Sequence, residues 1–232
     1  MPSDLFSLQQ RLKVEFKNQD LLRQAMVHRS YLNEHADFPF EHNERLEFLG
    51  DAVLELVVTE YLFKNFPKEP EGELTNWRAS LVNAKMLSVI AEELSIEENL
   101  YLSKGESKDK NSKARQFILA DAVEAIIGAM YMDTGMAVAK EFIERVIVTK
   151  LDNILKNELY FDPKSKFQEI SQEKFGITPH YEVLKEEGPD HAKTFDVGLY
   201  IADEQISIGI GSSKQEAQVA AAKKGLEKKG WE

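Results

Sequence analysis

The spacing of apolar residues divides the chain into two regions with different predicted secondary structure. Over the first two-thirds, apolar residues recur every three or four positions, which is typical of helices that bury one face. Segments such as Pro67 to Gly72 and Thr134-Gly135 interrupt this periodicity and mark turns. The spacing predicts helices over residues 5–14, 19–30, 43–66, 74–94, 114–134 and 138–158.

The pattern changes between Leu159 and Pro163. A helix is predicted over residues 163–175, because Pro163 suits the first turn of a helix. Apolar and polar residues then alternate in three runs, which is typical of strands with one buried face. These runs lie at residues 181–183, 195–201 and 206–210, and a last helix is predicted over residues 213–229.

The order of these elements predicts two domains. An all-α domain over residues 1–158 precedes a small α+β domain over residues 159–232. In the second domain, the order α-β-β-β-α predicts helices on one face of an antiparallel sheet. A chain of 232 residues with 43% hydrophobic residues can supply a core for each domain.

The composition excludes several kinds of protein. The chain has no cysteine, which excludes a disulfide framework, a thiolate zinc site and a cysteine nucleophile. Its first residues lack the apolar segment of a secretory signal, and no apolar run is long enough to span a bilayer. We therefore expect a cytoplasmic protein with no membrane partner.

The net charge of −11 by itself argues against a nucleic-acid partner, because phosphate binding usually depends on Lys and Arg. Any contact with RNA must therefore come from local patches of positive charge. A group of carboxylates that binds cations would account for part of the acidic excess.

Acidic residues occur at helical spacing within residues 42–51. Glu44, Glu47 and Asp51 are separated by three and four positions, so a helix places all three on one face. Apolar neighbours, including Phe48, predict that this helix is mostly buried. Buried carboxylates are costly unless cations or hydrogen bonds compensate them.

A second acidic pair, Asp121 and Glu124, lies in an otherwise apolar helix. No basic residue occurs between Arg115 and Lys140, so this helix cannot neutralise its own carboxylates. Two helices that each carry carboxylates on an apolar face favour a shared site for a hard cation such as Mg²⁺, which prefers oxygen ligands.

Other interpretations of these acidic residues are possible. Salt bridges with arginines of the core, such as Arg45 or Arg78, would explain one acidic pair but are less favoured for two. A di-iron carboxylate bundle needs Glu-x-x-His on two helices, and this motif does not occur. The chain also lacks a P-loop and a His-Glu-x-x-His motif, so we expect neither a nucleotide cofactor nor a zinc-protease site.

Residues 42–51 read His-Asn-Glu-Arg-Leu-Glu-Phe-Leu-Gly-Asp and closely resemble the signature of the ribonuclease III family. The resemblance continues through residues 71–74, 81–83 and 119–125, in order along residues 1–158. Ten consecutive signature positions and a second motif at matching distance make the resemblance specific. It implies that the first domain is an all-α endonuclease domain.

The resemblance assigns roles to the acidic residues. It implies that Asp51 and Glu124 are the catalytic pair. It also implies that Glu47, Asp121 and Glu124 bind Mg²⁺, for which Mn²⁺ can substitute. Glu44 matches an acid at the dimer interface that frames the cleavage valley, and an acid favoured only by the helix dipole is an equally weighted alternative.

The resemblance also implies an activity. A water activated by the metal would attack the phosphodiester of double-stranded RNA and leave 5′-phosphate and 3′-hydroxyl ends. A homodimer would cut both strands and leave short 3′ overhangs. Precursors of ribosomal RNA and other structured transcripts are the implied substrates.

The second domain resembles a double-stranded-RNA-binding domain at residues 163–169, 179–181, 188–191 and 211–217. Such domains recognise the shape of A-form RNA through its 2′-hydroxyls and phosphates. The implied RNA contacts are Gln168, Glu169, His191, Ser213 and Lys214. The family usually has further basic residues beside Lys214, where this chain has Gln215, so we expect weaker binding with the phosphate site retained. Outside this motif, a loop histidine and a solvated lysine would be the simpler interpretations.

Two other classes of protein fit the sequence less well than an enzyme. A relative that binds duplex RNA without cutting it would be expected to lack one of the acids Glu47, Asp51, Asp121 and Glu124, and all four are present. A helical metal-storage protein would need histidine ligands that are missing, and it would leave the second domain unexplained.

Overall fold

The computed structural model describes the chain except for residues 1–4, 110–111, 158–161, 190–192 and 232. The chain forms two compact units, residues 1–160 and 161–232. The predicted boundary between residues 158 and 159 lies outside the described residues. No helix in the described part of the chain is both long enough and apolar enough to cross a membrane.

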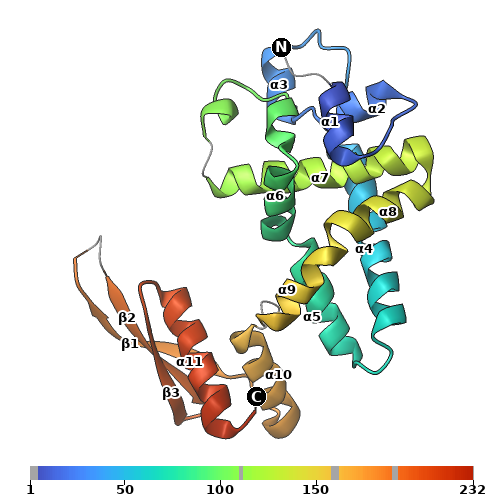
Figure 1. Ribbon diagram of the computed structural model, residues 1–232. Helices are drawn as coiled ribbons and strands as arrows, with labels where there is room; N and C mark the ends of the chain where they lie inside the picture. Colours follow the sequence, from blue (N-terminus) through green and yellow to red (C-terminus); the bar gives the residue numbers. More distant parts are fainter. Residues whose placement is uncertain (1–4, 110–111, 158–161, 190–192, 232) are drawn as a thin grey trace. The chain divides into compact units, whose positions relative to one another are not determined.

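The named elements in the described part of the N-terminal unit are all helices, and an isolated β-bridge joins Val27 to Tyr101 (Figure 1). Its α-helices are α1 (Leu5–Leu12), α2 (Gln19–Ala25), α3 (Arg29–Glu34), α4 (Glu44–Asn65), α5 (Glu71–Val82), α6 (Ala84–Glu93), α7 (Lys113–Thr134), α8 (Met136–Val146) and α9 (Leu151–Lys156). Short 3₁₀ helices occur at η1 (Ile96–Asn99), η2 (Glu106–Lys108) and η3 (Val148–Lys150). The all-α prediction for this region is therefore confirmed.

Three of the long helices predicted from apolar spacing are broken in the structure. The predicted helix over residues 74–94 is wrong because Asn83 accepts a hydrogen bond from the backbone N–H of Met86 at 2.9 Å and starts α6. The prediction over residues 19–30 fails in the same way, since the His28 side chain caps α3. The third, over residues 138–158, is interrupted by η3. Apolar spacing continues across these breaks because the helices on both sides pack on one core.

Helices α4 and α7 are the long central helices of this unit, with 22 residues each, and they cross in contact with each other (Figure 1). Helix α7 is buried on most of its surface, which agrees with its almost continuous apolar sequence. Helix α4 buries one face, which includes Leu46, Val53 and Leu54. These two helices therefore organise the core that the other helices cover.

The prediction that α4 is mostly buried is wrong for its second face. The side chain of Phe48 is 81% exposed, and Leu56 and Phe63 further along the helix are 58% and 72% exposed. Phe48 lies two positions from both Leu46 and Gly50, which places it on nearly the opposite side of the helix from these buried residues. Helix α4 thus presents an exposed apolar stripe, which we define as Phe48, Leu56 and Phe63.

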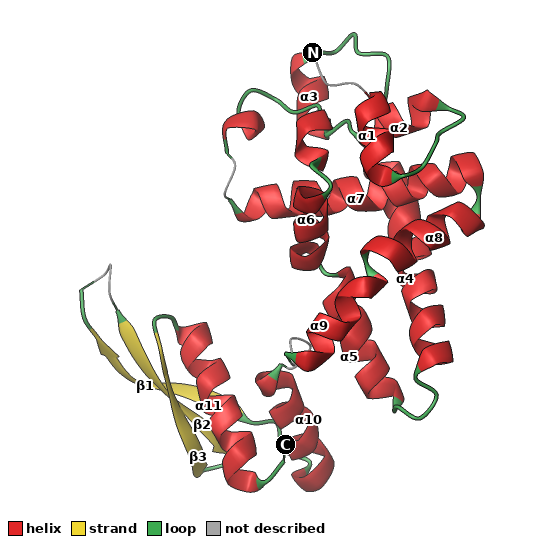
Figure 2. Ribbon diagram, in the orientation of Figure 1, coloured by secondary structure: helices red, strands yellow, loops and turns green. Residues whose placement is uncertain are grey.

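The C-terminal unit has the predicted order α-β-β-β-α (Figure 2). Its elements are α10 (Pro163–Phe175), β1 (His180–Glu187), β2 (Thr194–Ile201), β3 (Glu204–Gly211) and α11 (Lys214–Lys229). The strands form an antiparallel sheet in the order β1-β2-β3. The predicted fold class is therefore confirmed for both regions.

The core of the C-terminal unit lies between the sheet and its two helices. Phe167 of α10 and Leu199 of β2 are fully buried, together with Leu226 of α11. A Cβ atom at Gly209 would lie 2.1 Å from the backbone oxygen of Ala217, so only glycine allows α11 to approach β3 so closely. This packing leaves the outer surfaces of α10 and of the start of α11 exposed.

Candidate metal centre and RNA-binding surface

The backbones of α4 and α7 touch at two glycines. A Cβ atom at Gly50 would lie 1.7 Å from the backbone oxygen of Glu124, and a Cβ atom at Gly128 would lie 2.1 Å from that of Leu46. Any side chain at either position would force the two helices apart. Glu47 lies one turn before Gly50 on α4, and Glu124 lies one turn before Gly128 on α7. The contact between the helices places these two glutamates opposite each other.

Three carboxylates meet at this crossing. Glu47, Asp121 and Glu124 each offer one oxygen, and these oxygens all lie within 4.8 Å of one another. Each side chain is partly buried at the edge of the core. We call this group the carboxylate trio. The structure therefore brings together the three residues that the family resemblance implies as metal ligands.

Asp51 and Glu44 lie on the same helix as Glu47 but outside the trio. Asp51, one turn further along α4, is exposed, and its negative charge contributes to raising the pKa of both Glu47 and Glu124. Glu44 is also exposed, and it lies 3.6 Å from Nη1 of Arg29 and 3.7 Å from Nδ1 of His42. The structure thus gives Glu44 positively charged or titratable neighbours that the sequence did not suggest.

Burial and mutual repulsion disfavour the charged forms of the trio. Burial, followed by the charge of Asp51 and of the other two carboxylates, raises the pKa of Glu124 to about 8. Burial and then the charge of Asp121 raise the pKa of Glu47 to about 7. The pKa of Asp121 is also raised, mainly by burial. The free protein therefore holds negative charge here at a cost in free energy.

Salt bridges do not explain the trio. Among the described residues, no Lys, Arg or His forms an ion pair with Glu47, Asp121 or Glu124. The charge of Arg29 lowers the pKa of Asp121 but does not reverse the effect of burial. The side chain of Arg45 is exposed, and Arg78 donates a hydrogen bond to Thr59 Oγ1 at 3.1 Å instead. Three carboxylate oxygens that lie within 4.8 Å of one another are suited to bind one hard divalent cation.

A cavity of about 620 Å³ opens beside the trio. Its lining residues are His28, Arg29, Ser30, Asn33, Asn43, Glu44, Glu47, Glu106, Ala114, Phe117, Ile118 and Asp121. Two members of the trio, Glu47 and Asp121, thus face a space that a substrate can enter. The lining joins α3 and the start of α4 to the first half of α7.

The predicted RNA contacts that the structure describes in the C-terminal unit lie on α10 and at the start of α11. Gln168 and Glu169 are exposed on α10. Ser213 accepts a hydrogen bond from the backbone N–H of Glu216 at 3.2 Å and caps α11, and the exposed Lys214 is the first residue of that helix. His191 lies outside the described residues.

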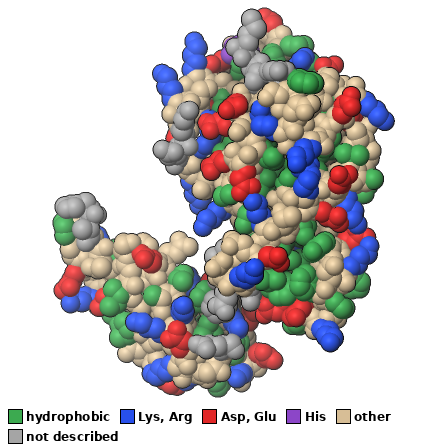
Figure 3. Space-filling model, in the orientation of Figure 1, with side chains coloured by type: hydrophobic (Ala, Val, Ile, Leu, Met, Phe, Trp, Pro, Cys, Tyr) green, Lys and Arg blue, Asp and Glu red, His purple; other side chains and the backbone are tan. Residues whose placement is uncertain are grey.

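Positive charge on the protein surface is local. Figure 3 shows Lys and Arg side chains interspersed with Asp and Glu side chains over the visible face. Lys214 at the start of α11 and Arg29 beside the trio are such local charges. This distribution agrees with the expectation that a chain with a net charge of −11 must contact RNA through small patches.

Sequence reasoning missed two features of this site. It gave no role to Gly50 and Gly128, although glycine inside an apolar helix is unfavourable and therefore signals a packing or functional reason. It also gave no role to Arg29, which borders the cavity beside the trio. No local pattern marks Arg29, because its neighbours in the cavity come from distant parts of the chain.

Comparison with known proteins identifies both units. A family model described as ribonuclease-III-like matches residues 18–151, and a model of the double-stranded RNA binding motif matches residues 163–229. The fold and the site thus define a helical nuclease domain followed by a double-stranded-RNA-binding domain.

Individual relatives agree with this class. The chain is 45% identical over 224 residues to ribonuclease 3 of Carboxydothermus hydrogenoformans, covering 97% of this chain and 95% of that protein. It is 44% identical to ribonuclease 3 of Campylobacter jejuni serotype O:6, covering 96% of each. The crystal structure of the nuclease domain of ribonuclease III from Campylobacter jejuni is 42% identical and covers 64% of this chain and 96% of that domain, with a TM-score of 0.57. The chain belongs to the ribonuclease III family, and it is an endoribonuclease for double-stranded RNA.

We predict that Gly50→Ala destabilises the protein by about 1–3 kcal/mol, because overpacking forces α4 away from α7. Gly72→Ala is the matched control, since a Cβ atom there has no atom within 4 Å. Urea unfolding measures the free energy of unfolding of both variants. Equal stability of Gly50→Ala and the wild type would contradict the close crossing.

We predict that Glu124→Gln stabilises the metal-free protein at alkaline pH. An acid with a raised pKa contributes stability that is present below its unfolded pKa and is lost as pH rises through its folded pKa, here about 8. We compare the free energy of unfolding of Glu124→Gln with that of the wild type in EDTA. The difference in favour of Glu124→Gln should grow by roughly 1–3 kcal/mol between about pH 5.5 and pH 8.5, after allowance for solvent screening.

Thermal or urea unfolding across this pH range measures the effect. Glu69→Gln, at an exposed position between α4 and α5, is the control and should show no such growth. Added Mg²⁺ should stabilise the wild type more than Glu124→Gln, because ligand binding favours the folded state. A gain for Glu124→Gln that is the same at every pH would refute the electrostatic cost assigned to the trio.

Proposed function

We propose that the protein hydrolyses both strands of duplex RNA in a reaction that requires Mg²⁺, for which Mn²⁺ can substitute. The products are 5′-phosphate and 3′-hydroxyl ends with short 3′ overhangs. The carboxylate trio is the observation that carries this proposal. Glu47, Asp121 and Glu124 would hold the cation with one carboxylate oxygen each, because Mg²⁺ prefers oxygen ligands.

Asp51 and Glu124 are the proposed catalytic pair. A bound cation lowers the pKa of the attacking water and stabilises the charge that develops on the leaving 3′ oxygen. Glu124 is partly buried within the trio, so its carboxylate is held in a defined position. Asp51 is exposed one turn beyond Glu47, where its carboxylate is open to accept a hydrogen bond from water.

The C-terminal unit, proposed as residues 159–232, would bring duplex RNA to the nuclease domain of residues 1–158. Gln168 and Glu169 are exposed on α10, which allows them to contact 2′-hydroxyls in a minor groove. Lys214 at the start of α11, with Ser213 beside it, is suited to a backbone phosphate. We extend the proposal to His191, on the strength of the family resemblance.

A homodimer is proposed on the apolar stripe of α4. Phe48, Leu56 and Phe63 are unusually exposed for large apolar side chains, and exposed apolar surface on one helix face is typical of interaction sites. A solved structure of the nuclease domain of ribonuclease III from Campylobacter jejuni describes a region involved in dimer formation. Two copies joined through this stripe would carry two trios, one for each RNA strand.

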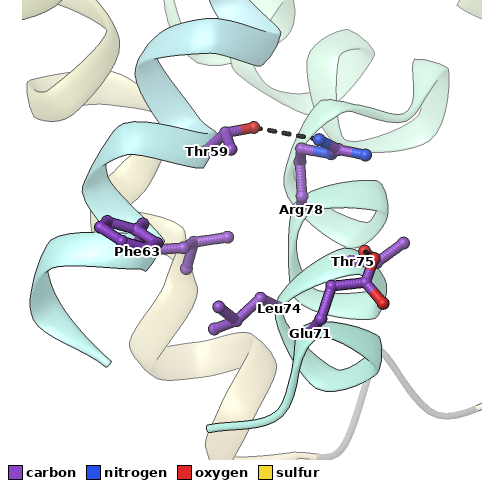
Figure 4. A pocket seen from close by; sticks show the side chains of 7 residues that line it. Thr59, Phe63, Glu71, Leu74, Thr75 and Arg78 are labelled. Carbon is purple, nitrogen blue, oxygen red and sulfur yellow. Dashed lines mark hydrogen bonds between the residues drawn. The ribbon is translucent and has the colours of Figure 1, made fainter. Parts of the chain in front are cut away.

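A groove beside the stripe supports the same interface. It lies between α4 and α5 and has a volume of about 210 Å³ (Figure 4). Its lining residues are Thr59, Leu62, Phe63, Glu71, Leu74, Thr75 and Arg78. The hydrogen bond from Arg78 to Thr59 spans the two helices near this groove. An apolar side chain from a second copy would fit against Phe63 and Leu74.

The cellular role that we propose is the processing of ribosomal RNA precursors and other structured transcripts in the cytoplasm. This role rests on the family and on the double-stranded RNA binding motif. The net charge of −11 agrees with it, because contacts limited to small patches favour recognition of duplex shape over tight, non-specific binding.

Cleavage of a long perfect RNA duplex tests the metal and the catalytic residues. The wild type should cut with Mg²⁺ and not with EDTA. Glu124→Gln should still bind the duplex but lose cleavage by at least about 100-fold, because it removes a carboxylate charge from the trio at nearly constant shape. Gel assays of cleavage and binding on the same samples measure both effects.

Three results would contradict the proposal. Cleavage that survives EDTA would exclude a metal mechanism. Normal turnover by Glu124→Gln would refute its catalytic role. A wild type that binds the duplex but never cuts it would favour a non-cutting RNA-binding protein.

The dimer is tested by Phe48→Glu, which should convert the protein to a monomer and lower cleavage by about ten-fold or more. Phe48 is largely exposed in one chain, so the substitution leaves the fold of each chain intact. Ile210→Glu is the control, since Ile210 is an exposed apolar residue of β3 outside the stripe. Sedimentation measures the mass of both variants, and a dimeric Phe48→Glu protein would show that the interface lies elsewhere.

A further inference from the structure

Arg29 carries a fixed positive charge at the mouth of the carboxylate site. Among the described residues that line the cavity of about 620 Å³, it is the only Lys or Arg. The acidic residues in the same lining are Glu44, Glu47, Glu106 and Asp121. A phosphodiester that enters this cavity is therefore repelled by carboxylates and attracted by one guanidinium, apart from any bound cation.

The backbone around Arg29 is firmly anchored. The preceding residue, His28, donates its backbone N–H to Tyr101 at 3.1 Å, and the backbone N–H of Asn43 donates to Val27 at 2.9 Å. These bonds fix the start of α3 against both the strand-like segment at Tyr101 and the start of α4. The position of Arg29 relative to the trio is thus set by the fold of the nuclease unit, which is what substrate positioning requires.

The Arg29 guanidinium has donors available for a ligand. Its side chain is 72% exposed, and its closest acidic partner is Glu44 Oε1 at 3.6 Å, longer than a hydrogen bond. A guanidinium carries five N–H donors arranged for two-point contact with a phosphate. Asn33, four residues along α3, lines the same cavity and adds an exposed amide on the same helix face.

Electrostatics connect Arg29 with the trio. The charge of Arg29 lowers the pKa of Asp121, opposing the effect of burial. His28 cannot supply the same charge at neutral pH, because burial lowers its pKa. Arg29 is therefore the cavity residue whose positive charge acts on Asp121, one of the proposed metal ligands, at neutral pH.

We propose that Arg29 binds a backbone phosphate of duplex RNA next to the scissile phosphate, and that Glu44 holds the guanidinium in place when RNA is absent. This inference rests on the proposed function of the trio. A guanidinium–phosphate contact is charge-assisted and directional, so it positions the strand as well as attracting it. It also offsets part of the repulsion between RNA and the acidic cavity.

Cleavage kinetics of Arg29→Ala at a series of KCl concentrations test the proposal. With Mg²⁺ and a duplex of defined length, kcat/KM should fall roughly 10- to 100-fold, as expected for the loss of one charge-assisted hydrogen bond. The slope of log(kcat/KM) against log salt should become shallower by about 1, because one phosphate contact is lost. Arg29→Lys should restore the slope but only part of the rate.

Lys17→Ala is the matched control for loss of one positive charge. Lys17 is exposed and its backbone N–H bonds Asp133 at 2.7 Å, near the far end of α7 from Asp121. The slope of log(kcat/KM) against log salt for Lys17→Ala should equal that of the wild type. The Glu124→Gln background, in which RNA binding is measured without cleavage, should show the same difference in slope when Arg29→Ala is added.

The variant Glu44→Gln distinguishes two roles of Arg29: binding an RNA phosphate, and only neutralising the charge of Glu44. If Arg29 contacts phosphate, Arg29→Ala lowers kcat/KM by the same factor in the Glu44→Gln background as in the wild type. If the cost disappears in that background, or if Arg29→Ala keeps the wild-type salt slope, the inference is overturned. A wild type that does not cut duplex RNA with Mg²⁺ overturns the proposed function instead, so the two failures are distinguishable.

Discussion

The close crossing of α4 and α7 is the contact on which the rest of the nuclease unit depends. Gly50 and Gly128 let the two backbones touch, because a Cβ atom at either position would overlap a backbone oxygen of the other helix. The crossing places one carboxylate of α4 and two of α7 within 4.8 Å of one another. The same contact therefore organises the apolar core and assembles the site.

The site is built at the expense of stability. Burial and mutual repulsion raise the pKa of Glu47 to about 7 and that of Glu124 to about 8, and no ion pair among the described residues relieves them. An interior salt bridge would remove this cost but would also occupy the oxygens that a cation needs. The unrelieved charge is thus physically consistent with a site whose compensating partner comes from outside the chain.

An acidic nuclease for RNA has to confine its attraction for phosphate to a few places. The net charge of −11 opposes binding of RNA as a whole, while Lys214 is the first residue of α11 and Arg29 borders the cavity beside the trio. Each of these residues is exposed and is the first residue of a helix. A few positive charges at defined positions favour recognition of the shape of duplex RNA over non-specific binding of polyanions.

The sequence alone determined that a helical region precedes a region of order α-β-β-β-α, and it identified the acidic residues, because periodicity and short motifs are local properties. It did not determine the breaks at His28 and Asn83, since apolar spacing runs through both. Only the tertiary structure decided that Phe48 faces outward and that Arg29 lines the same cavity as Glu47 and Asp121. The exposure of Phe48 and the position of Arg29 both depend on how the helices pack on one another. The close approach of α7 to α4 at Gly50 is part of that packing.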